Sequence, residues 1–260
     1  MKIGFTTAFV DAARLYHRDS ALLLPLAGAT LFLPQYALLL LVPPMSATLP
    51  AGAFDGNGPN AAGQAAIADA VSAWLASYGG WYVVASLLGL FGALAVMTLY
   101  LTREGPTLSG ALRRAGALSL RYLLASILIG VVALSILLPG VMARLLLAAL
   151  MPLAFYILGR TMLAGPAIVG EAPTGAIAAI QRSWALTRGN GWMLGATYAA
   201  PLFCAQLIGS ALLSLVQFGG GNPVIGAIVG GLVALVQATA ALTLALVEVT
   251  LYRRLANTGT

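Results

Sequence analysis

Long apolar runs alternate along this chain with short segments that carry its few charged residues. A helix needs about 20 apolar residues to cross the hydrocarbon core of a bilayer. Six runs reach or approach that length: residues 20–42, 81–101, 122–138, 145–163, 192–218 and 224–251. Since a helix satisfies its backbone hydrogen bonds within one segment, the pattern predicts an all-α integral membrane protein. It has about six transmembrane helices in a single polytopic domain, residues 1–260.

Glycine and proline mark the two least obvious boundaries between these runs. The stretch from Gly189 to Val247 has no charged residue and is too long for one crossing, so Gly-Gly-Gly-Asn-Pro at 219–223 predicts a turn. Pro139-Gly140 separates the third run from the fourth in the same way. The third and fourth runs are the shortest, so four or five crossings remain an alternative.

The first run is too long for the apolar part of a secretory signal peptide. It extends from Ser20 to Val42, which is 23 residues, whereas that part of a signal peptide has about 7–15. We therefore expect a retained first span, with cleavage near Ser46 and Ala47 as the alternative.

The basic residues predict how the spans are oriented, because cytoplasmic loops retain Lys and Arg. With the N-terminus inside the cell, only Arg144 of the thirteen basic residues falls on the outer side. The long outer segment 43–80 contains Asp55 and Asp69 but no basic residue. The cytoplasmic basic residues are Lys2, Arg14, Arg18, Arg103, Arg113, Arg114, Arg121, Arg160, Arg182, Arg188, Arg253 and Arg254. Because richness in Arg, Ala, Gly and Leu is typical of GC-rich bacterial genomes, we expect a multi-pass protein of the bacterial cytoplasmic (inner) membrane with both termini in the cytoplasm.

Composition excludes several classes of protein. Only 8% of the residues are charged, against about 25% in soluble domains, so the chain cannot cover a water-exposed globular surface. A net charge of +6 would suit nucleic acid if one face were basic; here the charges lie between apolar runs, and no nucleic-acid partner is expected. The single cysteine, Cys204, can form neither a disulfide nor a cysteine-based metal site within the chain, and no metal ion or cofactor is expected.

Three segments on the predicted cytoplasmic side, residues 4–18, 106–120 and 173–188, each precede a pair of spans. Apolar residues three or four apart, beside arginines, are typical of short amphipathic helices. Such helices lie among headgroups and contact anionic membrane phospholipids, which are the expected partners. The pattern favours three repeats of an interfacial helix followed by a two-span hairpin, with ordinary loops as the alternative. Residues 60–78 also show helical spacing, and Gly79-Gly80 predicts a turn before the second span.

Few polar residues fall inside the predicted spans. Arg160 and Glu248 lie near the inner ends of the fourth and sixth spans, where snorkelling of the arginine and pairing of the glutamate with Arg253 account for them. Gln206 and Gln237 fall near the middle of two antiparallel neighbours, where a hydrogen bond between them would join the helices. A substrate site lined by both is the alternative.

Two small-residue motifs in the last two spans, Gly191-x-x-x-Gly195 and Gly226-x-x-x-Gly230, are typical of helices that approach closely. With 30 glycines in the chain, neither motif is specific.

No set of residues in the sequence is typical of a catalytic site. Metal-dependent and His-dependent hydrolases bring several His, Asp or Glu side chains to one place. The chain has one histidine, His17, and its carboxylates are scattered among basic residues. We therefore expect a protein that is not an enzyme.

A stretch of about 40 residues resembles the signature of one bacterial family. It reads Arg160, Pro166, Val169-Gly170-Glu171, Ala178, Arg182-Ser183-Trp184-Ala185-Leu186-Thr187-Arg188-Gly189 and Trp192. This pattern resembles the family of the membrane domain of glycerophosphoryl diester phosphodiesterase, which includes stand-alone multi-span bacterial membrane proteins. The resemblance implies a membrane module without hydrolase activity, because hydrolysis in two-domain members is attributed to a separate soluble domain for which this chain has no room.

The candidate residues in this stretch form a lipid-headgroup or structural motif. Arg160 is positioned to pair with Glu171 across the turn after the fourth span, and Trp184 would anchor the third interfacial helix at the headgroups. Arg182 and Arg188 would bind phosphate oxygens, since Arg binds them bidentately. Ser183 has no candidate base nearby in the sequence and is expected to pack. The alternative is that the motif only fixes the turn and docks the helix onto the bundle.

These observations favour a non-catalytic multi-span inner-membrane protein that engages phospholipid or a partner protein. The alternative is a transporter or channel for a small or lipid-like solute, with Gln206 and Gln237 facing a cavity. A water-filled, polar-lined cavity that reaches the midplane of the membrane would favour this alternative, and a closed apolar bundle with basic surface helices would favour the first interpretation. The sequence sets no oligomeric state.

Overall fold

The computed structural model of the chain describes residues 5–45, 48–49, 61–102, 107–141, 144–218 and 222–257. Within these ranges it contains helices and no strands. The helices are α1 (Phe5–Ala27), the π-helical turn η1 (Gly28–Phe32), α2 (Leu33–Leu41), α3 (Ala61–Leu101), α4 (Leu108–Val141), α5 (Arg144–Thr161), α6 (Ala164–Gly170), α7 (Ala176–Leu186), α8 (Gly191–Phe218) and α9 (Pro223–Asn257). Residues that carried some predictions but lie outside the described ranges are Lys2, Gly4, Ser46, Ala47, Asp55, Asn60, Arg103, Pro106 and Gly219, Gly220 and Gly221.

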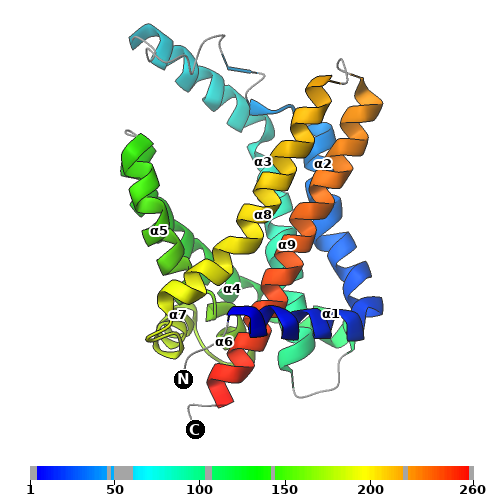
Figure 1. The fold of residues 1–260 in the computed structure, drawn as a ribbon, viewed down its shortest axis with the longest axis vertical. Coiled ribbons are helices and arrows are strands. Elements are labelled where there is room, and N and C mark those ends of the chain that lie inside the picture. The colour runs from blue at the N-terminus through cyan, green and yellow to red at the C-terminus, as the bar shows by residue number, and fades with distance from the viewer. Residues whose placement is uncertain are drawn as a thin grey trace.

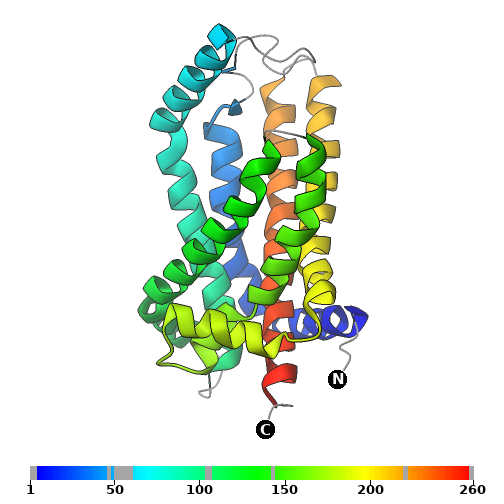
Figure 2. The same ribbon diagram turned by 90° about the vertical axis from the view of Figure 1, so that its left-hand side faces the viewer.

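Six segments are long and apolar enough to cross a membrane, which confirms the predicted fold class. They are Thr6–Leu41, Gly63–Leu101, Leu108–Leu138, Ala148–Gly170, Gly191–Val216 and Pro223–Ala256, and each corresponds to one predicted run. Figure 1 shows α2, α8 and α9 standing together, while α5 diverges from α8 away from the termini. Both views show the short α6 and α7 at the same end as the two termini (Figures 1 and 2).

The first span is entered through a bend at Asp19, whose backbone angles are φ −117° and ψ 21°. The part of α1 before Asp19 lies across the end of the bundle (Figure 1), as predicted for an interfacial segment. Further along, the wider π-helical turn η1 interrupts the α-helix just before Pro34. In a regular α-helix the proline ring would clash with the carbonyl group four residues earlier, and one π-turn relieves that clash.

The predicted turn at Gly79-Gly80 is wrong, because α3 continues through both glycines as one helix of 41 residues. Residues 61–78, the described part of the predicted outer segment, and the second span are therefore parts of one element. A glycine in a helix costs about 1 kcal/mol relative to alanine, which a long packed helix can absorb, so two glycines without a proline do not end α3.

The three predicted repeats differ in shape. Segment 106–120 does not form a separate helix: its described residues are the first turns of α4, since the sequence around Arg121 has neither proline nor glycine to end the helix. α4 also continues through Pro139 and Gly140 to Val141. Only the third segment forms a helix of its own, α7, which is separated from α6 and α8 by turns.

The predicted boundary before the last span is confirmed, because α8 ends at Phe218 and a new helix, α9, begins at Pro223. Pro223 occupies the first position of α9, where its missing N–H group costs nothing. The Asn222 side-chain oxygen accepts a hydrogen bond from the Val224 N–H group at 2.9 Å, which is the usual N-cap arrangement.

Helices α5 and α8 approach each other most closely where two glycines meet. A Cβ atom added to Gly195 would lie 2.8 Å from the Phe155 carbonyl oxygen, and one added to Gly159 would lie 2.2 Å from the Gly195 nitrogen. The first small-residue motif therefore does permit close approach. The second does not act in this way, because Gly226 faces open space and Gly230 has only an ordinary side-chain contact.

The buried core lies at the end of the bundle that holds α6. Leu94 and Met97 of α3, Leu163 and Ile168 beside or within α6, and Leu246 of α9 are among the largest fully buried side chains. The residues of α6 from Ala164 to Val169 are all buried. The close packing at this end of the bundle holds the surrounding polar side chains in position.

Candidate functional site

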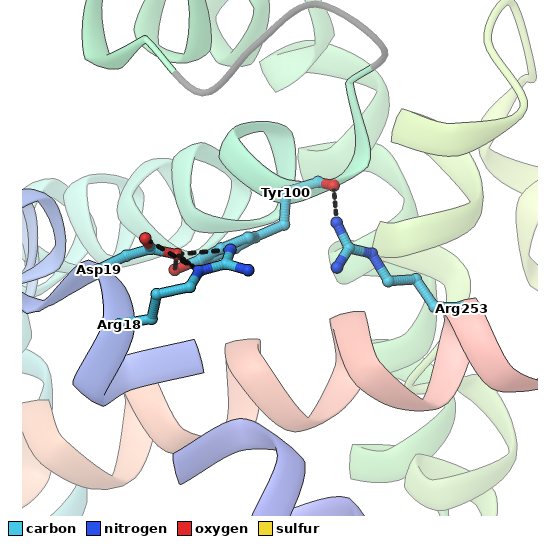
Figure 3. Close-up of polar contacts among 4 residues, drawn as sticks. All are labelled: Arg18, Asp19, Tyr100 and Arg253. Atoms are coloured by element: carbon cyan, nitrogen blue, oxygen red, sulfur yellow. Dashed lines mark hydrogen bonds and ion pairs between the residues drawn. The ribbon is translucent and has the colours of Figure 1, made fainter. Parts of the chain in front are cut away.

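Two polar networks, each built on a carboxylate, a tyrosine and an arginine, surround the packed end of the bundle. We call this end the basic end and define it by Arg18, Arg160, Arg182 and Arg253. In the first network, Arg18 Nη2 lies 2.8 Å from Asp19 Oδ2, and the Tyr100 hydroxyl donates to the same oxygen at 2.9 Å (Figure 3). Arg253 donates to the carbonyl oxygen of Tyr100, and its guanidinium lies 5.8 Å from the centroid of that ring. The network therefore joins the first, second and sixth spans.

The second network is built on Glu171, directly after α6. Arg182 Nε donates to Glu171 Oε1 at 2.8 Å, and the Tyr252 hydroxyl donates to the same oxygen at 3.1 Å. The hydrogen bond from Arg182 to Glu171 raises the pKa of the Arg182 guanidinium. The predicted pair between Arg160 and Glu171 is absent, because Arg182 of α7 occupies the carboxylate instead. With side-chain exposures of 44% and 34%, this ion pair contributes little by itself.

Arg160 is buried instead of reaching toward the membrane surface as predicted. Only 6% of the residue is exposed, and its guanidinium lies 4.5 Å from the centroid of the Trp184 ring. The face of an indole ring attracts a cation, which accounts for this position. Within the described residues, Arg160 Nε has no hydrogen-bond partner.

Ser183 and Thr187 satisfy the backbone groups that the break between α5 and α6 leaves unpaired. The Ser183 hydroxyl donates to the Arg160 carbonyl oxygen at 2.8 Å and accepts from the Leu163 N–H group at 3.1 Å. Thr187 Oγ1 lies 2.7 Å from the Ser183 carbonyl oxygen and 3.2 Å from the Arg160 carbonyl oxygen, either of which can accept its one proton. Both side chains are fully buried. These contacts dock α7 onto the end of the fourth span, as the structural interpretation of the motif requires.

The outer side of α7 is exposed. Trp184 is 42% exposed although one face of its ring covers Arg160. The Arg188 side chain is exposed and has no ion-pair or hydrogen-bond partner among the described residues. Of the two arginines predicted to bind phosphate, Arg182 is therefore already paired with Glu171, whereas Arg188 remains accessible.

A cavity of about 570 Å³ lies between α3, α4, α8 and α9, with α2 and η1 at its side. This volume lies in the usual range of small-molecule sites, about 300–1,000 Å³. Leu90, Leu202 and Leu244 contribute to its apolar walls. The lining residues Gln35 of α2, Ser86 of α3 and Ile127 of α4 are exposed, so the cavity is open to the surroundings on the side of these helices. The polar residues of its lining are Gln35, Ser86, Tyr122, Ser126, Tyr198, Gln237 and Glu248.

Glu248 lines this cavity and is only 9% exposed. Within the described part of the chain its carboxylate has neither an ion pair nor a hydrogen bond, and it acts electrostatically on Tyr122 and Tyr198. The predicted pairing with Arg253 is wrong, because Arg253 donates to Tyr100. Residues five apart on an α-helix point about 140° apart, so Arg253 faces the first network while Glu248 faces the cavity.

The predicted pair of Gln206 and Gln237 is also absent. Gln237 lines the cavity, three helical turns before Glu248 on the same face of α9. Gln206 is exposed, and no hydrogen bond joins the two described side chains. The face of α8 that meets α9 carries Gly209, whose added Cβ would lie 3.9 Å from Gln237 Nε2. Gln206, one turn earlier, is exposed and makes no such contact.

Sequence reasoning missed most of the polar lining, because each polar residue stands alone within its own span. Two signals were available. Tyr122 and Ser126 are four residues apart, and Gln237 and Glu248 are eleven apart, which places each pair on one face of its helix. Neither spacing shows that the faces of α4 and α9 meet.

Comparisons with protein families, with curated proteins and with solved structures found no match to this chain. The class of the protein therefore follows from its fold, which is an all-α protein with six candidate membrane-spanning helices. Among the residues that the structure describes, no group of three or more His, Cys, Asp or Glu side chains is positioned to hold a metal ion.

Proposed function

We propose that this chain is a non-catalytic membrane protein that admits a lipid-like, amphiphilic solute into the cavity between α3, α4, α8 and α9. The lining of that cavity is the observation that carries the proposal. Its walls are apolar, and polar groups from Tyr122, Tyr198 and Glu248 meet at one place. An amphiphile matches both parts, because its tail covers the apolar wall while its head meets the polar groups.

The surroundings of the opening support a lipid-like solute over a water-soluble one. Leu87 of α3 and Leu124 and Ile127 of α4 are 42–51% exposed next to it. In a bilayer such side chains face hydrocarbon, so a solute that enters between α3 and α4 comes from the lipid phase. Of the two functions expected from the sequence, the cavity favours the solute-binding one.

The remaining parts of the proposal concern the membrane around the protein. We place the chain in the bacterial inner membrane with the basic end and both termini in the cytoplasm, following the distribution of arginines. Trp184 and Arg188 then lie among the headgroups of the cytoplasmic leaflet, where exposed tryptophan and arginine are favourable. The resemblance to the membrane domain of glycerophosphoryl diester phosphodiesterase supports a module without catalytic activity of its own.

A pair of glycine substitutions on α3 tests whether the cavity holds an amphiphile. Gly89 lines the cavity, and a Cβ atom there would meet nothing within 4 Å, so the side chain of Gly89→Phe extends into the cavity without a clash at its base. Gly80→Phe is the matched control, because Gly80 also faces open space but does not line the cavity.

We expect native mass spectrometry to find lipid or added amphiphile bound to the wild-type protein and to Gly80→Phe. Binding to Gly89→Phe should fall to a small fraction of the wild-type level, while its thermal unfolding midpoint stays close to that of the control. Equal binding by the two variants would contradict the proposal.

A further inference from the structure

Glu248 is the one carboxylate among the described residues that is buried. Burying an ionised carboxylate without a partner is costly, so buried charges in proteins are normally paired or hydrogen-bonded. Ionisable residues within membrane spans usually mark functional sites for the same reason. The carboxylate of Glu248 therefore requires an explanation that packing alone does not supply.

Among the described residues, no arginine side chain forms an ion pair with the Glu248 carboxyl group. Arg253, the nearest arginine in the sequence, donates to the backbone of Tyr100 and stacks on that ring. Arg160 lies against Trp184 on the other side of the packed end. Arg182 is paired with Glu171. A cationic group that occupies the cavity would supply the missing counter-charge, whereas a buried carboxyl group without one takes up a proton.

Two tyrosines share the cavity with this carboxylate. Tyr122 and Tyr198 both line it, close enough to the Glu248 carboxyl group for an electrostatic interaction. Tyr122 is held in place by close packing, because a Cβ atom added to Gly165 would lie 2.8 Å from its ring. Aromatic rings beside a carboxylate form a suitable environment for an ammonium group, which rings attract through their faces.

We infer that the cavity selects amphiphiles with a cationic head, a protonated amine or a quaternary ammonium, and that Glu248 binds this head. The apolar tail then lies along the leucines of the wall. This inference rests on the proposed function, since it names the ligand class of the same cavity. An amine-headed phospholipid and a single-chain alkylammonium compound both carry this chemistry, whereas an anionic amphiphile is repelled.

Paired probes separate the role of the charge from binding in the cavity as such. The purified protein, in an uncharged maltoside detergent, is titrated with tetradecylammonium and with tetradecanol, which has the same tail and no charge. Two further arms use phosphatidylethanolamine and phosphatidylglycerol, followed by native mass spectrometry. The variants are Glu248→Gln, Glu248→Asp, and Asp69→Asn as a control at an exposed carboxylate outside the cavity.

We expect Glu248→Gln to bind tetradecylammonium about tenfold more weakly or worse, because hydrogen bonds to charged groups are the stronger ones. Binding of tetradecanol should change less than about twofold, and Glu248→Asp and Asp69→Asn should keep the preference for the cation. Tighter wild-type binding of phosphatidylethanolamine than of phosphatidylglycerol identifies a lipid as the source of the head; preference for tetradecylammonium alone identifies a single-chain cation.

Two results would overturn the inference. One is unchanged binding of the cation by Glu248→Gln, and the other is an equal loss for both probes, which indicates a change in the cavity and not in its charge. Both leave the proposed function intact as long as tetradecanol still distinguishes Gly89→Phe from Gly80→Phe. If that pair does not differ, the proposed function fails independently of Glu248.

Discussion

At the scale of single residues, Ser183 shows how one hydroxyl group can hold a membrane helix to an interfacial one. Its oxygen accepts from Leu163 N–H and donates to the Arg160 carbonyl, so both sides of the break between α5 and α6 are satisfied by one side chain. The chain breaks there without leaving backbone groups unpaired in a buried place, which would be costly.

Replacing this serine tests the role of the motif. We expect Ser183→Ala to lower the free energy of unfolding by about 1–3 kcal/mol, the usual cost of leaving buried backbone groups without partners. Thermal unfolding of the purified protein in detergent measures the change. Ser119→Ala is the control, because the Ser119 hydroxyl is exposed and bonds only to the backbone of its own helix; a similar loss in both variants would contradict the assigned role.

Residue pairings could be predicted only in part. The sequence identified Arg160, Glu171, Arg182, Ser183, Trp184 and Arg188 as one motif, and the structure brings five of them into contacts around α6 and α7. It did not predict which arginine meets Glu171, because that depends on how α7 is rotated about its own axis. If α7 were rotated so that a residue one or two positions away faced Glu171, a different side chain would pair with the carboxylate.

At the scale of elements, the crossing of α5 and α8 depends on the absence of side chains at two glycines. Gly159 and Gly195 allow the two backbones to touch, and larger residues there would force the helices apart. Packing of this kind, without a hydrophobic driving force between helices, is a main source of stability for spans within a bilayer.

We expect Gly195→Leu to destabilise the protein, because its Cβ atom alone would lie 2.8 Å from a backbone carbonyl oxygen of α5. Gly226→Leu, on α9, should be neutral or slightly stabilising, since nothing lies near its added Cβ atom and leucine favours a helix by up to about 1 kcal/mol relative to glycine. The thermal unfolding midpoints of the two variants and the wild type provide the measurement. Equal midpoints for the two variants would show that the crossing does not need glycine.

The existence of the spans was predictable, but several of their ends were not. Hydropathy identified the six spans, because the bilayer imposes a minimum length of apolar sequence. It failed at Gly79-Gly80 and around Arg121, where the chain continues as helix on both sides of the expected boundary. A polar residue or a glycine marks a possible turn, and only tertiary packing decides whether the helix ends there.

At the scale of the whole molecule, we propose an orientation in the membrane from the arginines at the basic end. In a Cys204→Ala background, we expect the cysteine of Asn222→Cys to react in intact cells with a membrane-impermeant maleimide. The cysteine of Arg188→Cys should react only after the cells are opened, because the two positions lie at opposite ends of α8. Labelling of Arg188→Cys in intact cells would reverse the predicted orientation.

The cavity is a property of the whole molecule and was not predictable from the sequence. Its lining comes from helices that lie far apart along the chain, with Ser86 on α3, Tyr122 on α4 and Glu248 on α9. The pattern within one span indicates which residues share a face, but not which faces of different spans meet. For this reason the sequence predicted that Glu248 pairs with Arg253 on its own helix, although its side chain faces three other helices.

The unbroken α3 has a mechanical consequence outside the bundle. At 1.5 Å per residue its 41 residues extend about 60 Å, roughly twice the thickness of the hydrocarbon core. Its first part carries the exposed Gln64 and Asp69, and the Trp74 indole N–H donates to the Pro43 carbonyl oxygen at 3.1 Å. The helix thus forms a projecting arm braced against the end of the first span. In the membrane placement that we propose, this arm extends beyond the outer surface of the bilayer, where an antibody or a soluble protein would meet it first.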